Sequence, residues 1–171
     1  MATLEVKIYS NETIEKLANE ILAHTGFLEP SAIDIVKLAK ELGLNVYSAS
    51  LNGYSGYIKF ENGEKNIYIN HLDSRERKRF TIAHELGHYL LHRNLIEKEG
   101  GTVLYRGING DIIEQQANRC AGALLMPESM VKKYFNEINE SVNIKISVLA
   151  KIFDVSINAM YTRLSILGLL Q

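Results

Sequence analysis

Two histidines and a glutamate stand close together in the sequence, in the order His84-Glu85-Leu86-Gly87-His88. Four residues of an α-helix turn through about 400° and rise about 6 Å, so His84 and His88 would lie one turn apart on one face. That spacing suits two ligands of a single metal ion. Glu85 would be offset by about 100°, beside the metal, where a carboxylate can take a proton from a water molecule held there. The spacing therefore predicts a hydrolytic metal centre.

The residues around this motif predict a helix that is largely buried. The run from 79 to 92 contains Phe80, Ile82, Ala83, Leu86, Leu90 and Leu91. Buried polar groups need partners, which disfavours the alternative of two surface histidines beside a solvated glutamate. His-Glu-x-x-His on a helix is the arrangement of zinc peptidases, in which the glutamate is the general base.

Gly87 stands in the middle of this helix, where glycine costs roughly 1 kcal/mol relative to alanine. Tight packing of another helix would explain it, and so would the close approach of a substrate. The sequence leaves both interpretations open.

A catalytic zinc ion usually has three protein ligands and one open position. His92 lies about 12 Å of helix rise from His84, too far to share its metal ion, and we expect it near the helix end. The extended metzincin pattern would need glycine at 91 and histidine at 94, where this chain has Leu91 and Asn94.

Glu114 is the better candidate for a third ligand. It lies in a segment from 111 to 126 whose apolar residues follow helical spacing. Asp111 is a plausible N-cap, so Glu114 could instead complete a capping box. Asn118, one turn further on, is either a hydrogen-bond partner of a metal ligand or an ordinary surface residue. Cys120 lies on a different face, and we expect a buried, inert thiol.

These residues together carry a resemblance to a known family. The run from 79 to 92, then Glu114-x-x-Ala117-Asn118, then Leu124-Leu125-Met126-Pro127, resembles the ImmA/IrrE family of metallopeptidases, and the likeness extends more weakly from about residue 14 to the C-terminus. The resemblance implies zinc on His84, His88 and Glu114, with Glu85 as general base. It also implies a narrow protein substrate, often a transcriptional repressor, commonly in mobile elements or stress responses. Cys120 departs from the family pattern, which more usually has an aromatic there.

The composition is that of a soluble globular protein. The chain has 171 residues, 46% hydrophobic and 23% charged, which suffices for one core with a small appended subdomain. The net charge of −1 gives no overall electrostatic signal for nucleic acid. We expect no membrane span and no signal peptide. The single cysteine excludes an internal disulfide and suits the cytoplasm. Nothing indicates an oligomeric state.

The expected fold class is α+β, a minimal zincin-like domain. Helices are predicted at 14–21 and from Pro30 to Gly43, followed by strands at 45–47, 55–60 and 66–70 in a small, mostly antiparallel sheet with a hairpin turn at 61–64. Residues 73–76 form a capping box for the metal helix. An edge strand above the metal could pair with an extended substrate.

Residues 93–110 contain several glycines and no clear period, which predicts a long loop, either a mobile substrate flap or a passive linker. Tyr105, Arg106 and His71 are weak candidates for stabilising an oxyanion.

We divide the chain into a peptidase-like domain, 1–127, and a C-terminal helical subdomain, 128–171, packed on it. A helix is expected at 128–138, and 146–168 resembles a helix-turn-helix, with Ser156 as N-cap of the second helix. That helix offers Asn158, Tyr161, Thr162 and Arg163. Basic residues are few there, so DNA contact is disfavoured against packing on the core or binding a protein partner.

The leading hypothesis is therefore a zinc-dependent endopeptidase that cleaves a specific regulatory protein, such as a transcriptional repressor. The alternatives are a non-catalytic, zinc-containing module that binds regulatory proteins, and a helix-turn-helix DNA-binding regulator. Glu85 favours the enzyme, because a structural zinc site has no use for a base beside the metal.

Overall fold

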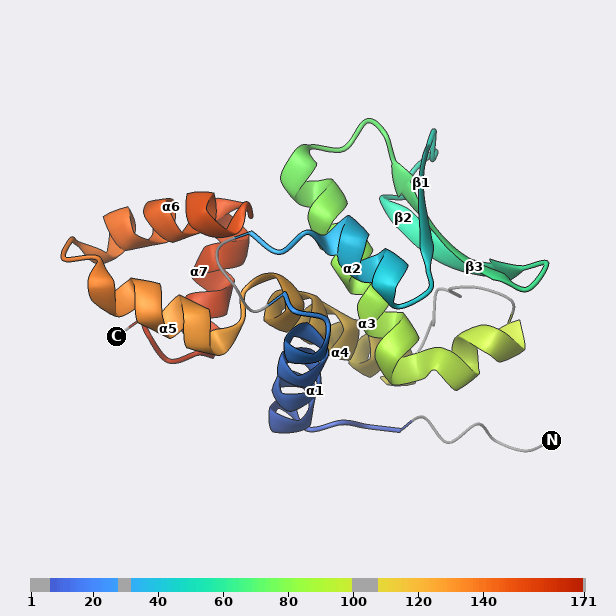
Figure 1. Cartoon of the computed structure of the whole chain (residues 1–171), viewed down its shortest axis with the longest axis horizontal. Helices are drawn as coiled ribbons and strands as arrows, with labels where there is room; N and C mark the ends of the chain where they lie inside the picture. The colour runs from blue at the N-terminus through green and yellow to red at the C-terminus, as the bar shows by residue number, and fades with distance from the viewer. Residues whose placement is uncertain (1–6, 28–31, 100–107, 171) are drawn as a thin grey trace.

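The protein has the expected α+β fold, a three-stranded sheet with helices (Figure 1). The computed structural model describes residues 7–27, 32–99 and 108–170. The elements are α1 (Asn11–His24), α2 (Ile35–Glu41), β1 (Asn45–Ala49), β2 (Gly56–Glu61), β3 (Glu64–Asn70), α3 (Arg75–Glu99), α4 (Ile108–Leu125), α5 (Glu128–Glu137), α6 (Val142–Phe153) and α7 (Ile157–Ile166). The sheet lies at one end and α5–α7 at the other, with α3 and α4 between them. No helix in the described part of the chain is long and apolar enough to cross a membrane.

The sheet is built around the predicted hairpin. Asn62 and Gly63 both have positive φ, 53° and 78°, the backbone that a two-residue hairpin turn requires, and β2 pairs antiparallel with β3. β1 pairs with the other edge of β3 in parallel. The sheet, in the order β1-β3-β2, is thus mixed rather than mostly antiparallel, because the hairpin places β3 between the two earlier strands. Ile58 and Ile67 are fully buried in the core cluster.

The metal helix α3 begins where predicted but ends later. Ser74 caps it by accepting a hydrogen bond from the Arg77 backbone N–H at 3.2 Å. The helix kinks at His92 (φ −125°, ψ 23°) and continues to Glu99, because Leu95 and Ile96 bury a further apolar face. The predicted loop at 93–110 is therefore wrong at both of its ends, since residues 93–99 and 108–110 are helical.

The predicted starts of two helices, α2 and α4, need correction. The second helix is capped by Asp34, whose Oδ1 accepts from the Lys37 N–H at 3.0 Å; Pro30 lies outside the described residues. α4 begins at Ile108, so Asp111 is within its first turn and is not the N-cap. Tyr105 and Arg106 also lie outside the described residues.

The C-terminal helices share the hydrophobic core of the remainder of the chain. Leu149, Phe153 and Leu164 belong to the same buried cluster as the helices α1–α4 and the sheet. The predicted turn between α6 and α7 is confirmed: Asp154 is left-handed (φ 52°) and the Ser156 hydroxyl caps α7 by accepting from the Ala159 N–H at 3.1 Å.

Arg163 does not lie on the exposed face of α7, where the sequence placed it. Its side chain is 1% exposed. The guanidinium donates to the Met126 carbonyl at 2.9 Å and pairs with Glu15 of α1. A buried charge needs such partners, so Arg163 joins α7 to α1 and α4.

Candidate metal centre

The candidate centre lies where α3 and α4 cross. Gly87 of α3 lies directly against α4: a Cβ added there would be 2.8 Å from the Ala117 carbonyl oxygen and 3.2 Å from Cβ of Cys120. Only a residue without a side chain permits this approach. Of the two interpretations of Gly87, the structure therefore supports tight helix packing.

This close crossing brings the two predicted ligand segments together. His84 Nε2 lies 3.2 Å from Glu114 Oε2, and His88 Nε2 lies 3.2 Å from Glu114 Oε1. The two Nε2 atoms are 3.0 Å apart. Two imidazole nitrogens and one carboxylate thus converge from separate helices, and His84, His88 and Glu114 form a group able to bind a metal ion.

The spacing of these three donors fits a metal of zinc's size. Zinc–nitrogen and zinc–oxygen bonds of about 2.0–2.2 Å in tetrahedral geometry place neighbouring ligand atoms roughly 3.3 Å apart. The observed separations, 3.0 to 3.2 Å, are close to that value. Two nitrogens and one oxygen from three residues are also the donor number of catalytic zinc sites.

Asn118 fixes the orientation of one imidazole. Its side-chain carbonyl oxygen accepts a hydrogen bond from His84 Nδ1 at 2.9 Å. Nδ1 then carries a proton, so Nε2, which faces Glu114 and His88, is the nitrogen that would bind a metal ion. Of the two interpretations of Asn118, the structure therefore supports the partner of a metal-site residue.

The electrostatics of the group reflect its close contacts. Burial acts to lower the pKa of His84, but the hydrogen bond with Glu114 and the charge of Glu85 outweigh it, so the pKa is raised. Hydrogen bonds with His84 and His88 hold the pKa of Glu114 far below its usual value. Glu114 is therefore an anion at neutral pH, as a metal ligand must be.

Glu85 is buried beside this group, 4% exposed. It follows His84 on α3 and is close enough for its charge to raise the pKa of that histidine. The helical offset places it next to the convergent donors instead of among them.

His92 has a different role from the one predicted. It is buried at the kink of α3, not at the helix end. Its Nε2 lies 3.0 Å from Gln116 Oε1, and Gln116 Nε2 donates to the Tyr9 carbonyl at 3.1 Å. The sequence analysis missed Gln116. The only signal was its position two residues after Glu114, on the same helix as that ligand.

The remaining candidates do not join the centre. His71 is exposed, and its Nδ1 lies 3.0 Å from the Ala49 carbonyl oxygen. Cys120 is fully buried, and burial raises the pKa of its thiol to about 12. It is therefore protonated at neutral pH and packs as an apolar group.

Comparison with known proteins identifies the family. The IrrE N-terminal-like domain of the M78 peptidases matches residues 39–165. The chain belongs to the ImmA/IrrE family. The match includes both ligand helices and the C-terminal helices, so it covers the whole candidate centre. The family is one of metal-dependent peptidases, so membership supports peptidase activity at the level of the family.

A solved structure supports the fold. A transcriptional regulator of Mycobacterium tuberculosis superposes with a TM-score of 0.66 over 92% of this chain, at 19% sequence identity. At that identity the likeness is evidence for the fold alone. The chain spans 47% of the length of that regulator. Among curated proteins no significant match is found.

Proposed function

We propose that this protein is a zinc-dependent endopeptidase, with His84, His88 and Glu114 as metal ligands and Glu85 as general base. The observation that carries the proposal is the convergence of both Nε2 atoms on the Glu114 carboxylate, within 3.2 Å, at the crossing of two helices. Family membership supports the same chemistry.

Each of these side chains has a separate role in the proposed peptide hydrolysis. Bound zinc would polarise the scissile carbonyl and make a water molecule more acidic. Glu85 takes a proton from that water and later passes it to the leaving amine. Asn118 holds His84 in the tautomer that leaves Nε2 available. Glu85 and His88 are buried, 4% and 1% exposed, and the low dielectric around them strengthens their electrostatic interactions.

The sheet offers a place for the substrate backbone. β2 is an edge strand within the described sheet, and it lies directly against the metal helix: a Cβ on Gly56 would be 2.4 Å from Cγ2 of Thr81. Thr81 precedes His84 by one turn. We propose that an extended substrate pairs with β2, which would bring its scissile bond over α3.

We propose further that residues 1–127 form the catalytic domain, that 128–171 form a helical subdomain on it, and that the protein acts in the cytoplasm. Its substrate would be a regulatory protein, such as a transcriptional repressor. The family match supports a protein substrate.

Two rival functions have less support. A non-catalytic zinc module would not need a buried carboxylate beside the ligands, which Glu85 provides. A DNA-binding regulator would need exposed basic side chains on α7, whose single basic residue, Arg163, is buried.

Zinc analysis and proteolysis together test the proposal. We would co-express the wild-type chain, Glu85→Gln or His88→Ala with regulatory proteins encoded near it and identify cleavage fragments by mass spectrometry. The zinc content of each of the three proteins would be measured after purification. We expect wild type to hold zinc and cleave, Glu85→Gln to hold zinc without cleaving, and His88→Ala to lose both. Equal cleavage by Glu85→Gln and wild type would remove Glu85 as the base.

A further inference from the structure

A groove leads away from the metal centre along the crossing of α3 and α4. Phe80 stands one turn before His84 on α3, and Gly122 stands one turn after Asn118 on α4. Both line a groove of about 740 Å³, and Asn118 lines it too. Asn118 also bonds to His84, so the groove reaches the hydrogen-bond partner of one proposed ligand.

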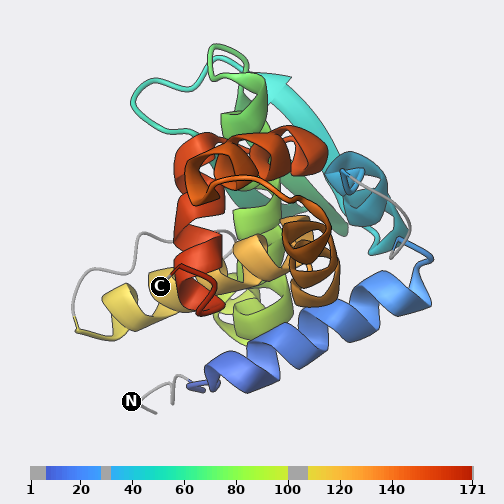
Figure 2. The same ribbon diagram turned by 90° about the vertical axis from the view of Figure 1, so that its left-hand side faces the viewer.

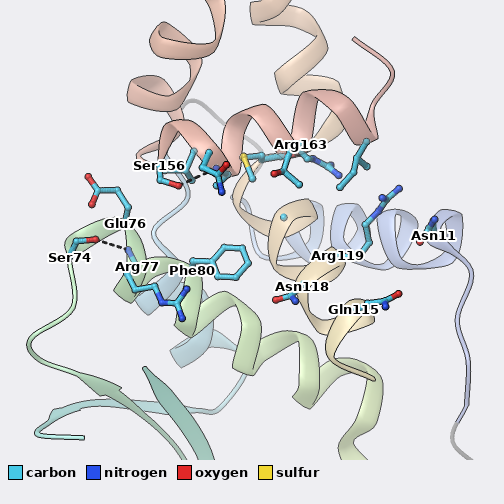
Figure 3. A pocket seen from close by; sticks show the side chains of 17 residues that line it. Asn11, Ser74, Glu76, Arg77, Phe80, Gln115, Asn118, Arg119, Ser156 and Arg163 are labelled. Carbon is cyan, nitrogen blue, oxygen red and sulfur yellow. Dashed lines mark hydrogen bonds between the residues drawn. The ribbon is translucent and has the colours of Figure 1, made fainter. Parts of the chain in front are cut away.

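The far wall of this groove is α7. Figure 3 shows the Phe80 ring pointing into the space between α3 and α7, with Asn118 beside it on α4. Ala159, Thr162 and Ile166 line the wall from α7. The second helix of the helix-turn-helix-like unit, α7, therefore forms one wall of the groove.

One part of the groove surface is apolar and suits an uncharged, apolar side chain, and polar residues line the rest. Phe80, Val155, Ala159 and Ile166 supply its apolar lining. The guanidinium of Arg163, at its end, is already paired with Glu15 at 2.8 Å. Arg119 lies 3.3 Å from the same carboxylate. Glu15 thus pairs with both arginines, while Arg77, which lines the groove together with Glu76, donates to the Ser55 hydroxyl at 3.0 Å.

Gly122 leaves room in the wall formed by α4. A Cβ added at Gly122 meets no atom within 4 Å, in contrast to Gly87 on the facing helix. This glycine is therefore not required for helix packing. Its effect is to keep the groove open opposite Phe80.

We propose that this groove binds the substrate polypeptide on one side of the scissile bond and selects a large apolar side chain between Phe80 and Gly122. The inference rests on the proposed peptidase function and adds the substrate preference. The occupant is a polypeptide because the groove reaches Asn118, which bonds to the proposed ligand His84, and the proposed reaction cleaves a polypeptide beside it. Its volume lies within the roughly 300–1,000 Å³ typical of ligand pockets, enough for more than one side chain. Asn158 and Thr162 at its polar edge offer hydrogen bonds to a substrate backbone.

Peptide binding to a zinc-loaded, inactive enzyme tests the inference without turnover. A randomised peptide library would be selected on the Glu85→Gln variant and on the same variant carrying Gly122→Leu or Ser165→Leu. Ser165 is exposed on α7 but does not line the groove, so Ser165→Leu is the matched control. The wild-type enzyme would then be incubated with the selected peptides, and their cleavage would be measured.

We expect binders to be enriched in large apolar side chains at one position. Gly122→Leu fills the groove and should weaken their binding at least tenfold, since one methylene group in an apolar pocket changes selectivity by about 10–200-fold. Ser165→Leu should leave binding unchanged, and zinc content should be equal in all three.

Binders without apolar enrichment, or unchanged binding in Gly122→Leu, would overturn the groove assignment and leave the peptidase proposal standing. Selected peptides that bind through the groove but resist cleavage by wild type would instead overturn the peptidase proposal, and with it the placement of the scissile bond.

Discussion

Gly87→Ala tests whether the contact between two helices sets the geometry of the metal centre. The new methyl carbon would lie 2.8 Å from the Ala117 carbonyl oxygen and 3.1 Å from its Cα. Both are backbone atoms, so α4 has to shift by several tenths of an ångström. Ala117 is one turn from Glu114, and Gly87 is flanked by His84 and His88. The shift therefore separates the carboxylate from the imidazoles.

The magnitude follows from two opposing effects. Overpacking a buried contact costs typically 1–3 kcal/mol, whereas replacing glycine by alanine within a helix gains about 1 kcal/mol. The net loss in free energy of unfolding is then about 0–2 kcal/mol. Displaced ligands should weaken metal binding by at least about tenfold, or about 1.4 kcal/mol.

Gly122→Ala is the matched control, because it makes the same change on α4 where no atom lies within 4 Å. It should raise the melting temperature by roughly 2–4 °C with unchanged metal affinity. Thermal denaturation of the metal-free proteins and titration against a zinc-chelating dye measure both quantities. If Gly87→Ala melts as high as Gly122→Ala and binds zinc as tightly as wild type, the contact does not control the centre.

Two further predictions concern the hydrogen-bond partners of the histidines. Asn118→Ala should weaken metal binding about 10–100-fold, because His84 loses the acceptor 2.9 Å from its Nδ1; Asn118→Asp retains an acceptor and should bind metal more tightly than Asn118→Ala in chelator competition. Burial lowers the pKa of His92 below its usual 6.5, so its contribution to stability is present above pH 6.5 and is lost as the pH falls toward the lowered value. The free energy of unfolding of the metal-free protein should therefore fall less between pH 7.5 and 5 in His92→Gln than in wild type, as measured by urea denaturation. An equal fall in both proteins would contradict this account.

Local sequence geometry predicted those parts of the site that one helix or turn determines. His84, Glu85 and His88 follow from helical periodicity, and the hairpin follows from the Asn62-Gly63 pair. Glu114 is different, because its approach to the histidines depends on Gly87 and α4. The sequence alone also permitted Glu114 to be a capping residue. The family resemblance supplied the long-range information that periodicity lacks.

The parts that local patterns predicted wrongly are those decided by distant partners. Residues 93–99 look like a loop by composition, yet Leu95 and Ile96 are buried and keep the segment helical. Gln116 gains its importance from His92 and from Tyr9, a residue remote in sequence. A local sequence motif does not predict a contact of this kind, because the partners are brought together only by the tertiary fold.

The C-terminal helices show how the same local pattern can serve another purpose. Their turn, with left-handed Asp154 and the Ser156 cap, is the one that the helix-turn-helix-like pattern of the sequence predicts. However, the one cation of α7 is held by Glu15 of α1, and Arg75 and Arg79 of α3 lie 2.7 and 3.3 Å from Asp154. These ion pairs attach the unit to α1 and to the metal helix α3. Figure 2, viewed from the end where α5–α7 lie, shows these helices in front of α3. If the groove binds substrate as we propose, a helix fixed in this way would discriminate among polypeptides, because its distance from Phe80 is set by the core and not by the ligand.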